Sequence, residues 1–285
     1  MRPIWVLANL TFREAMRRRI LLAGLLLGIC FLIVFSIGFH YIVQEVRREL
    51  TVELPSQSMV ELASAEIMNG FEMMGLYGVT FLSIAMAALL GADTLAGEIN
   101  SGTIQTIVAK PIRRSDVVLG KWLGFAGLLG LYVLLMAGGV VLSVFLQTGY
   151  APDHLARGLS LIYLEALVIM TVTVLCSSAF PALATGGIVF GLYGLAFIGG
   201  WIEQFGDVFN NQIAIKIGII TSLIIPSEVL WRRAAFEMQS LFAGANFESP
   251  FGAFSVPSLL MIVYAVLYLI GSLTLAIRVF QKRDL

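Results

Sequence analysis

Long apolar windows alternate with short polar stretches along the whole chain. Six windows hold about 20 residues each with almost no charge, and they cover residues 20–43, 71–90, 121–146, 158–179, 183–202 and 255–278. A helix of about 20 apolar residues can cross a hydrocarbon layer of about 30 Å with all its backbone hydrogen bonds made internally. The pattern predicts an all-α, polytopic membrane protein with six transmembrane helices in a single domain, residues 1–285.

Composition and charge support this class and exclude others. Hydrophobic residues make up 59% of the chain and charged residues 13%, against roughly 45–50% and about 25% in soluble domains. The net charge is zero, which gives no reason to expect a nucleic-acid partner. The two cysteines, Cys30 and Cys176, lie in apolar windows, so neither a disulfide framework nor a metal site is predicted. The first window lacks a small-residue cleavage pattern and is interpreted as a retained span.

The residues before the first window have helical amphipathic spacing. Ile4, Leu7, Ala8, Thr11 and Ala15 fall on one side, opposite Arg13, Arg17 and Arg18. This spacing predicts an elbow helix over residues 1–19 that lies along the inner leaflet, with its cations toward lipid phosphate. Alternatively, these residues form no such helix, and their arginines serve only as a topology signal beside the first span.

Lysine and arginine are unevenly distributed between the two sides of the predicted membrane. With the N-terminus inside, the inner segments carry twelve: Arg2, Arg13, Arg17, Arg18, Arg19, Lys110, Arg113, Arg114, Lys121, Arg278, Lys282 and Arg283. The outer segments carry six: Arg47, Arg48, Arg157, Lys216, Arg232 and Arg233. Because positive loops stay in the cytoplasm, we expect a multi-pass protein of the cell inner (plasma) membrane with both termini cytoplasmic.

Two outer segments are predicted. Residues 44–70 lie between the first two spans, either as a helical cap or as a flexible loop, and the acids from Glu45 to Glu72 are expected to form a solvated face. Residues 210–254 contain one short apolar run, 213–225, which is too short to cross and ends at Pro226. We interpret 210–254 as an outer re-entrant segment. Its Trp231, Arg232 and Arg233 would serve as an outer gate or an interfacial anchor at the headgroup level.

The inner loop, residues 91–120, is longer than a connector needs to be. Ser101 is a good N-cap for a helix over 103–109, and Pro111 stops that helix. The sequence therefore predicts a short helix lying crosswise under the membrane, joined at its ends to the second and third spans.

This loop resembles the signature loop of ABC-2-type transporter permeases. The resemblance is carried chiefly by Glu98, Ser101, Gly102, Thr103, Lys110, Pro111, Arg114 and Lys121. It implies that residues 91–120 contain the coupling helix, which docks on a separate ABC ATPase subunit. It also implies a type V exporter-like fold, a second permease protomer in a homo- or heterodimer, and ATP and Mg bound by the ATPase, with no cofactor on this chain.

The chain has no nucleotide-binding signature of its own. Gly120-Lys121 is followed by Trp122 rather than Ser or Thr, and no strand precedes it to present a phosphate loop. We therefore expect that this chain is not an enzyme and that ATP hydrolysis resides in the partner.

Other polar and small residues suggest a substrate pathway. Glu165 stands in the fourth span, where a carboxylate is costly and marks a substrate-lining or proton-linked group, or else an acid that reaches outer water or bonds a neighbouring Tyr or Thr. Glycines in the third and fifth spans allow close helix packing, within the chain or against a second protomer.

The sequence gives less support to two rival functions. A secondary transporter driven by an ion gradient would be expected to show several intramembrane charges or repeated halves. An intramembrane lipid-modifying enzyme or protease would need paired acids or a nucleophile with a histidine, and the sequence shows no such set in its spans.

Overall fold

The computed structural model describes residues 3–53, 56–92, 94, 96–97, 113–152, 154–239 and 256–282. Within these residues all regular structure is helical, and six helices are long and apolar enough to span a membrane. They are α2 (Arg19–Glu53), α3 (Gln57–Ala92), α6 (Arg114–Thr148), α7 (Leu155–Ala179), α8 (Ala182–Val208) and α11 (Leu259–Lys282). The predicted all-α, six-span membrane protein is confirmed.

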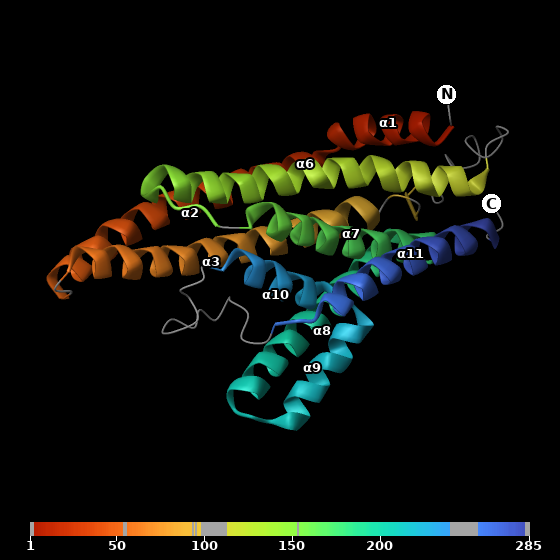
Figure 1. Cartoon of the computed structure of the whole chain (residues 1–285). Coiled ribbons are helices and arrows are strands. Elements are labelled where there is room, and N and C mark those ends of the chain that lie inside the picture. Colours follow the sequence, from red (N-terminus) through yellow and green to blue (C-terminus); the bar gives the residue numbers. More distant parts are fainter. Residues whose placement is uncertain are drawn as a thin grey trace.

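The bundle is elongated and has two distinct ends (Figure 1). Both chain termini and the start of α6 lie at one end, here called the terminal end. The C-terminal end of α2 and the N-terminal end of α3 lie at the other, here called the hairpin end. These two helices contain 35 and 36 residues, or roughly 50 Å each at 1.5 Å per residue, so they continue well past the length that a membrane requires. The described part of residues 44–70 is therefore helical.

The N-terminal helix α1 (Pro3–Met16) runs lengthwise along the first turns of α6 (Figure 1). Contacts advance in the same direction on both helices, from Ile4 and Leu7 opposite Gly120 to Phe12 opposite Gly127. Midway, a Cβ on Gly124 would lie 2.7 Å from the carbonyl oxygen of Ala8. Glycine is needed there because the two backbones approach too closely for a side chain. The orientation of α1 relative to the lipid stays a prediction.

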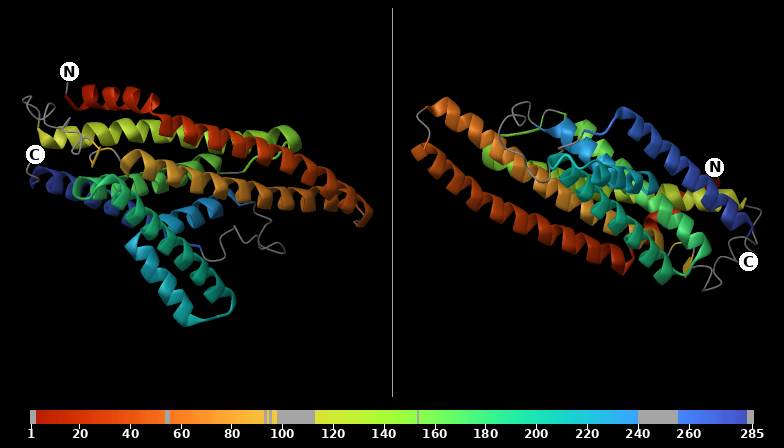
Figure 2. Two further views of the ribbon diagram at one scale, coloured as in Figure 1. Left: turned by 180° about the vertical axis from the view of Figure 1, so that it is seen from behind. Right: turned by 90° about the horizontal axis from the view of Figure 1, so that it is seen from below.

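Two shorter helices follow α8. Helix α9 (Gln212–Ile224) packs antiparallel to α8, and the side chain of Asn211 caps it by accepting from the backbone N–H groups of Ile213 and Ala214. The α8–α9 pair projects from the side of the bundle (Figure 2, left). Helix α10 (Ser227–Met238) then turns back by 105° relative to α9.

Helix α10 runs inside the bundle along α3. Its first turn lies beside Tyr77 of α3, and its last residue, Met238, accepts a hydrogen bond from Asn69, two turns nearer the hairpin end of α3. The C-terminus of α10 therefore points toward the hairpin end, and α11 runs toward the terminal end (Figure 1).

Candidate functional site

Most of the predicted coupling residues lie outside the described residues: Glu98, Ser101, Gly102, Thr103, Lys110 and Pro111. The structure describes the residues that flank them, together with Arg114, Lys121 and Glu165. The site is therefore built from the two anchors of the coupling loop and from the surroundings of Glu165.

Lys121 joins the two described flanks of the predicted coupling loop. It lies about two turns into α6, is only 5% exposed, and donates from Nζ to the carbonyl oxygen of Thr94 at 3.2 Å. Thr94 itself closes the C-terminus of α3 by bonding back to Gly91 and Leu90. A cation at a helix C-terminus is favoured by the partial negative charge of the last carbonyl groups. Lys121 is thus directed at α3 and is buried within this chain.

Arg114 makes a similar contact with a different helix. Its Nη1 donates to the carbonyl oxygen of Gln281, in the last turn of α11, at 3.2 Å. The first two turns of α6 therefore carry two cations that each bond the C-terminal end of another helix. Both residues belong to the predicted coupling motif, and the structure brings them to the C-terminal ends of α3 and α11.

An apolar cluster fills the space between these anchors. Its buried members are Val117 and Val118 of α6, Val174 of α7, and Ala276 and Phe280 of α11, with Leu7 of α1 packed against them. This cluster, together with the Lys121–Thr94 and Arg114–Gln281 bonds, is here called the terminal-end block. It holds five helices together beside the described flanks of the predicted coupling loop.

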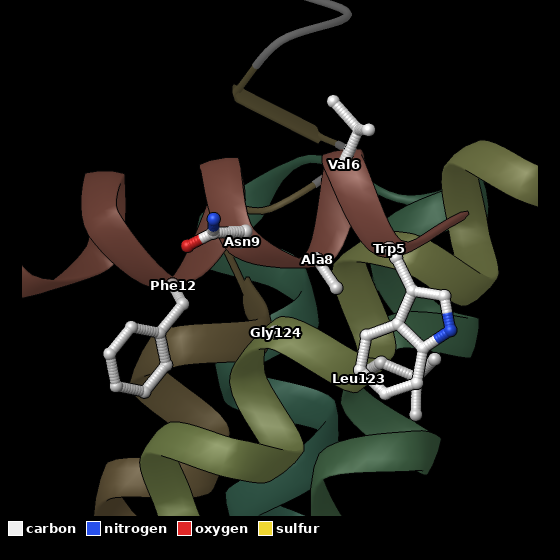
Figure 3. Close-up of a pocket in the computed structure, with 7 residues that line it drawn as sticks. All are labelled: Trp5, Val6, Ala8, Asn9, Phe12, Leu123 and Gly124. Atoms are coloured by element: carbon white, nitrogen blue, oxygen red, sulfur yellow. The ribbon is translucent and has the colours of Figure 1, made fainter. Parts of the chain in front are cut away.

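A groove opens on the surface of this region, between α1 and α6 (Figure 3). It has a volume of about 810 Å³ and is mainly apolar. Trp5 and Leu123 lie at one end, Phe12 at the other, and Ala8 faces Gly124 between them (Figure 3). Asn9 is its one polar lining side chain, so the groove suits apolar chains rather than a charged ligand.

Glu165 lies inside the bundle, on the face of α7 that packs against α10. It is 1% exposed, and its Oε2 has no hydrogen-bond partner among the described residues. Helix α7 packs against α10, which carries the buried Glu228. The expectation that this acid could reach outer water therefore does not hold in this conformation.

The structure also buries charged groups along α10 that sequence reasoning had not placed inside the bundle. Arg232 of α10 is 1% exposed and forms a bidentate pair with Glu203 of α8, at 2.8 and 2.9 Å. Glu228 accepts a hydrogen bond from the Tyr77 hydroxyl at 3.3 Å. The set Tyr77, Glu165, Glu203, Glu228 and Arg232 is here called the α10 cluster. It joins α3, α7, α8 and α10.

Two predictions are corrected by these positions. Trp231 and Arg232 were expected at the headgroup level, but both are buried because α10 lies inside the bundle, where Trp231 packs 5.0 Å from the Tyr77 ring. Glu72 was expected on a solvated face, but it is fully buried because the side of α3 that carries it packs inside the bundle. The spacing of Glu228 and Arg232, four residues apart, was the available signal for a charged helical face.

The described residues do not assemble a metal site. No group of three or more His, Cys, Asp or Glu side chains within the described ranges is arranged to hold a metal ion. The α10 cluster can hold its helices by ion pairing and hydrogen bonding, and the terminal-end block can transmit force between helices.

Comparisons with known proteins agree with this architecture. The family model described as ABC-2 family transporter protein matches residues 5–285. The probable ABC transporter permease protein NosY of Stutzerimonas stutzeri is 27% identical over 146 residues, which are 51% of this chain and 47% of that protein. Its namesake in Pseudomonas aeruginosa is 35% identical over 65 residues, 23% of this chain and 24% of that protein. The chain thus aligns with less than half the length of either relative. With six membrane-length helices and a family match over nearly all its residues, this multi-pass membrane protein belongs to the ABC-2 transporter family.

Proposed function

We propose that the chain is the permease subunit of an ATP-driven exporter and that it couples, through its Glu98–Lys110 segment, to a separate ABC ATPase that binds ATP and Mg. The observation that carries this proposal is the pair of anchors beside the segment. Thr94 precedes it and Arg114 follows it, and both are bonded into the terminal-end block. A load on the segment therefore reaches α3, α6 and α11 together.

The proposed mechanism follows from this attachment. ATP binding closes the ATPase pair and presses on the segment between residues 98 and 110. Because the terminal-end block is closely packed, the push moves the ends of its helices as a unit instead of deforming one loop. Helix α7 belongs to the block and also carries Glu165, so the shift reaches the α10 cluster. Glu165 would line the substrate pathway once α10 has moved.

The proposed location is the inner membrane, with the terminal end in the cytoplasm. The support is the excess of Lys and Arg in the segments assigned to that side. The exposed Trp5 and the arginines of residues 13–19 would contact lipid of the inner leaflet beside the groove of Figure 3.

We also propose that α8 contacts a second permease protomer. Cβ atoms added at Gly186, Gly187, Gly191 and Gly194 would meet nothing within 4 Å, whereas those at Gly199, Gly200 and Gly206 would meet α9 or α10. The first half of α8 thus presents an open small-residue face of the kind that lets helices approach closely in lipid.

The proposal is tested by co-purification with the ATPase encoded beside this chain, in mild detergent. Glu98→Arg should leave the permease monodisperse while it lowers ATPase recovery or uncouples hydrolysis from transport. Glu45→Arg is the matched control, because Glu45 is an exposed acid on α2 toward the hairpin end. If the unchanged protein never associates with an ATPase, the exporter proposal fails. If Glu98→Arg assembles and hydrolyses ATP like the unchanged protein, the role of Glu98 in coupling fails.

A further inference from the structure

The C-terminal end of α10 is bonded to three other parts of the bundle. The carbonyl oxygen of Met238 accepts a hydrogen bond from Asn69 of α3 at 3.3 Å. Arg233 donates from Nη1 to the carbonyl oxygen of Pro257, just before α11, at 3.3 Å. Glu237 places its Oε2 3.6 Å from Nη1 of Arg157, in the first turn of α7. The end of this short helix therefore closes against α3, α7 and the start of α11.

Glu237 is the acid that two arginines share at this end. Its Oε1 is bonded to Arg233, one helical turn earlier on α10, and its Oε2 faces Arg157. The side chain of Arg157 is 70% exposed, and that of Glu237 is 13% exposed. An ion pair that water reaches is weak and is screened by salt. The Arg157–Glu237 contact is therefore easier to open than a buried pair.

The other charged groups near α10 do not enter these contacts. Glu72 of α3 and Glu165 of α7 make no hydrogen bond to α10 within the described residues. The charged residues in the described part of α11, Arg278 and Lys282, lie in its last two turns, at the terminal end. In the ranges that the structure describes, Arg157 is the one ion-pair partner that another helix supplies to Glu237.

The N-terminal half of α10 is held more firmly. Arg232 and Glu203 form a bidentate pair at 2.8 and 2.9 Å, and their side chains are 1% and 10% exposed. Tyr77 donates a hydrogen bond to Glu228 in the first turn of α10. Removing one partner of a buried pair costs far more than opening an exposed pair. The two ends of α10 therefore differ in how strongly they are attached.

The connection before α10 allows the helix to turn as a unit. Helix α10 meets α9 at 105°, and Pro226 lies between them. Proline has no backbone N–H, so it donates no hydrogen bond across this bend. At the other end of α10, Met238 fills the space beside Gly158 of α7, where an added Cβ would lie 2.3 Å from Cγ of Met238. Methionine is flexible and adapts to repacking. The C-terminal contacts can therefore be released while the hydrogen bonds within α10 stay intact.

We propose that α10 is a latch that opens from its C-terminal end, with the Arg157–Glu237 pair opening first and the Glu203–Arg232 pair acting as the pivot. When the latch opens, Met238 leaves α7, and the face of α10 that packs on α7 meets solvent from the hairpin end. Release is a property of the folded chain by itself, and only its use in transport rests on the proposed function.

Cysteine labelling of the full-length protein in nanodiscs tests the latch. Ala235→Cys puts a thiol at a fully buried position of α10, in a chain whose native thiols are removed by Cys30→Ser and Cys176→Ser. Adding Glu237→Gln should speed maleimide labelling severalfold, while hydrogen exchange of the amides of residues 227–231 stays unchanged. Glu14→Gln is the matched control, because Glu14 also pairs with an arginine four residues away, on α1.

Two outcomes of this labelling overturn the proposal. One is labelling that Glu237→Gln speeds no more than Glu14→Gln does. The other is faster exchange at residues 227–231 in Glu237→Gln, which would mean that α10 unfolds or leaves as a whole.

Salt separates an ionic latch from general loosening. Because the Debye length is only about 3 Å at 1 M salt, 1 M NaCl should speed the labelling of Ala235→Cys. It should add nothing when Glu237→Gln or Arg157→Gln is already present, and an equal effect of salt in these variants would contradict the latch. No measurement here needs an ATPase, so the latch can fail while the exporter proposal stands, and the reverse.

Discussion

The terminal-end block and the α10 cluster hold helices together by opposite means. In the block, valine, alanine and phenylalanine side chains interlock, and each cation bonds the carbonyl end of a helix. In the α10 cluster, a buried ion pair and two further acids join a short helix to three longer ones. Apolar packing tolerates only one close-fitting arrangement, so it suits a part that transmits force. Buried charges can change partners or protonation, so they suit a part that moves.

The largest loss of stability is expected when the buried ion pair of the α10 cluster is broken. Arg232→Met leaves Glu203 charged, buried and without its partner, which should cost about 3–5 kcal/mol. Glu203→Met/Arg232→Met removes both charges and should recover most of that loss, because apolar groups of similar volume can replace a buried pair. Thermal unfolding in detergent measures both. A double variant as unstable as Arg232→Met would show that the pair contributes through more than charge balance.

Disturbing the close packing of α1 on α6 should cause the next largest loss of stability. Gly124→Ala places a Cβ 2.7 Å from the carbonyl oxygen of Ala8 and should cost about 1–3 kcal/mol as α1 is pushed off. Gly138→Ala, on the same helix, meets nothing within 4 Å and should be neutral or stabilising by up to about 1 kcal/mol. Thermal unfolding and the protease sensitivity of α1 report the outcome. Equal behaviour of the two variants would contradict the packing described for α1.

Removing Lys121, the buried cation of the terminal-end block, should cause a moderate loss of stability. Lys121→Met removes the bond to Thr94 and the charge at the C-terminus of α3, and should cost about 1–2 kcal/mol. Substrate-stimulated ATP hydrolysis should also become less coupled to transport, because the two ends of the coupling loop are no longer joined. Lys216→Met, at an exposed position on α9, is the control. Normal coupling in Lys121→Met would argue against force passing through this bond.

The smallest effect is expected for the exposed anchor. Arg114→Gln loses the bond to the carbonyl oxygen of Gln281, which should cost about 0.5–1.5 kcal/mol. Hydrogen exchange should increase in the last turn of α11 and stay unchanged in α9. Faster exchange throughout the bundle would mean that Arg114 supports more than this contact.

The positions of the spans could be predicted from the sequence, but the ends of the helices could not. The span windows were found from apolar length alone, since each helix must satisfy its own backbone in lipid. The ends of the helices were missed because α2 and α3 continue as helices past the apolar windows, where residues 44–53 are polar but still helical. Glu72, at the start of the second apolar window, was misplaced because the sequence pattern does not show which side of a helix packs inside the bundle.

The candidate site was only partly predictable. Lys121 and Arg114 were singled out from their motif, but their partners, Thr94 and Gln281, are 27 and 167 residues away. The pairing of Glu203 with Arg232 was not predicted, because Glu203 stands just past an apolar window and Arg232 lies in a segment assigned to the surface. Periodicity describes one element at a time and does not report which faces meet.

The sequence by itself determined that this protein is a six-span helical membrane protein, that its polar loop between the second and third spans resembles a coupling segment, and that it lacks a nucleotide-binding lysine motif. Those conclusions rest on local properties: apolar length, capping residues and proline. Only the tertiary structure decided that α10 is buried, that Glu203 pairs with Arg232, and that Lys121 bonds the end of α3. These depend on contacts between distant segments, and the close approach of helices at glycines such as Gly124 and Gly200 decides which side chains meet.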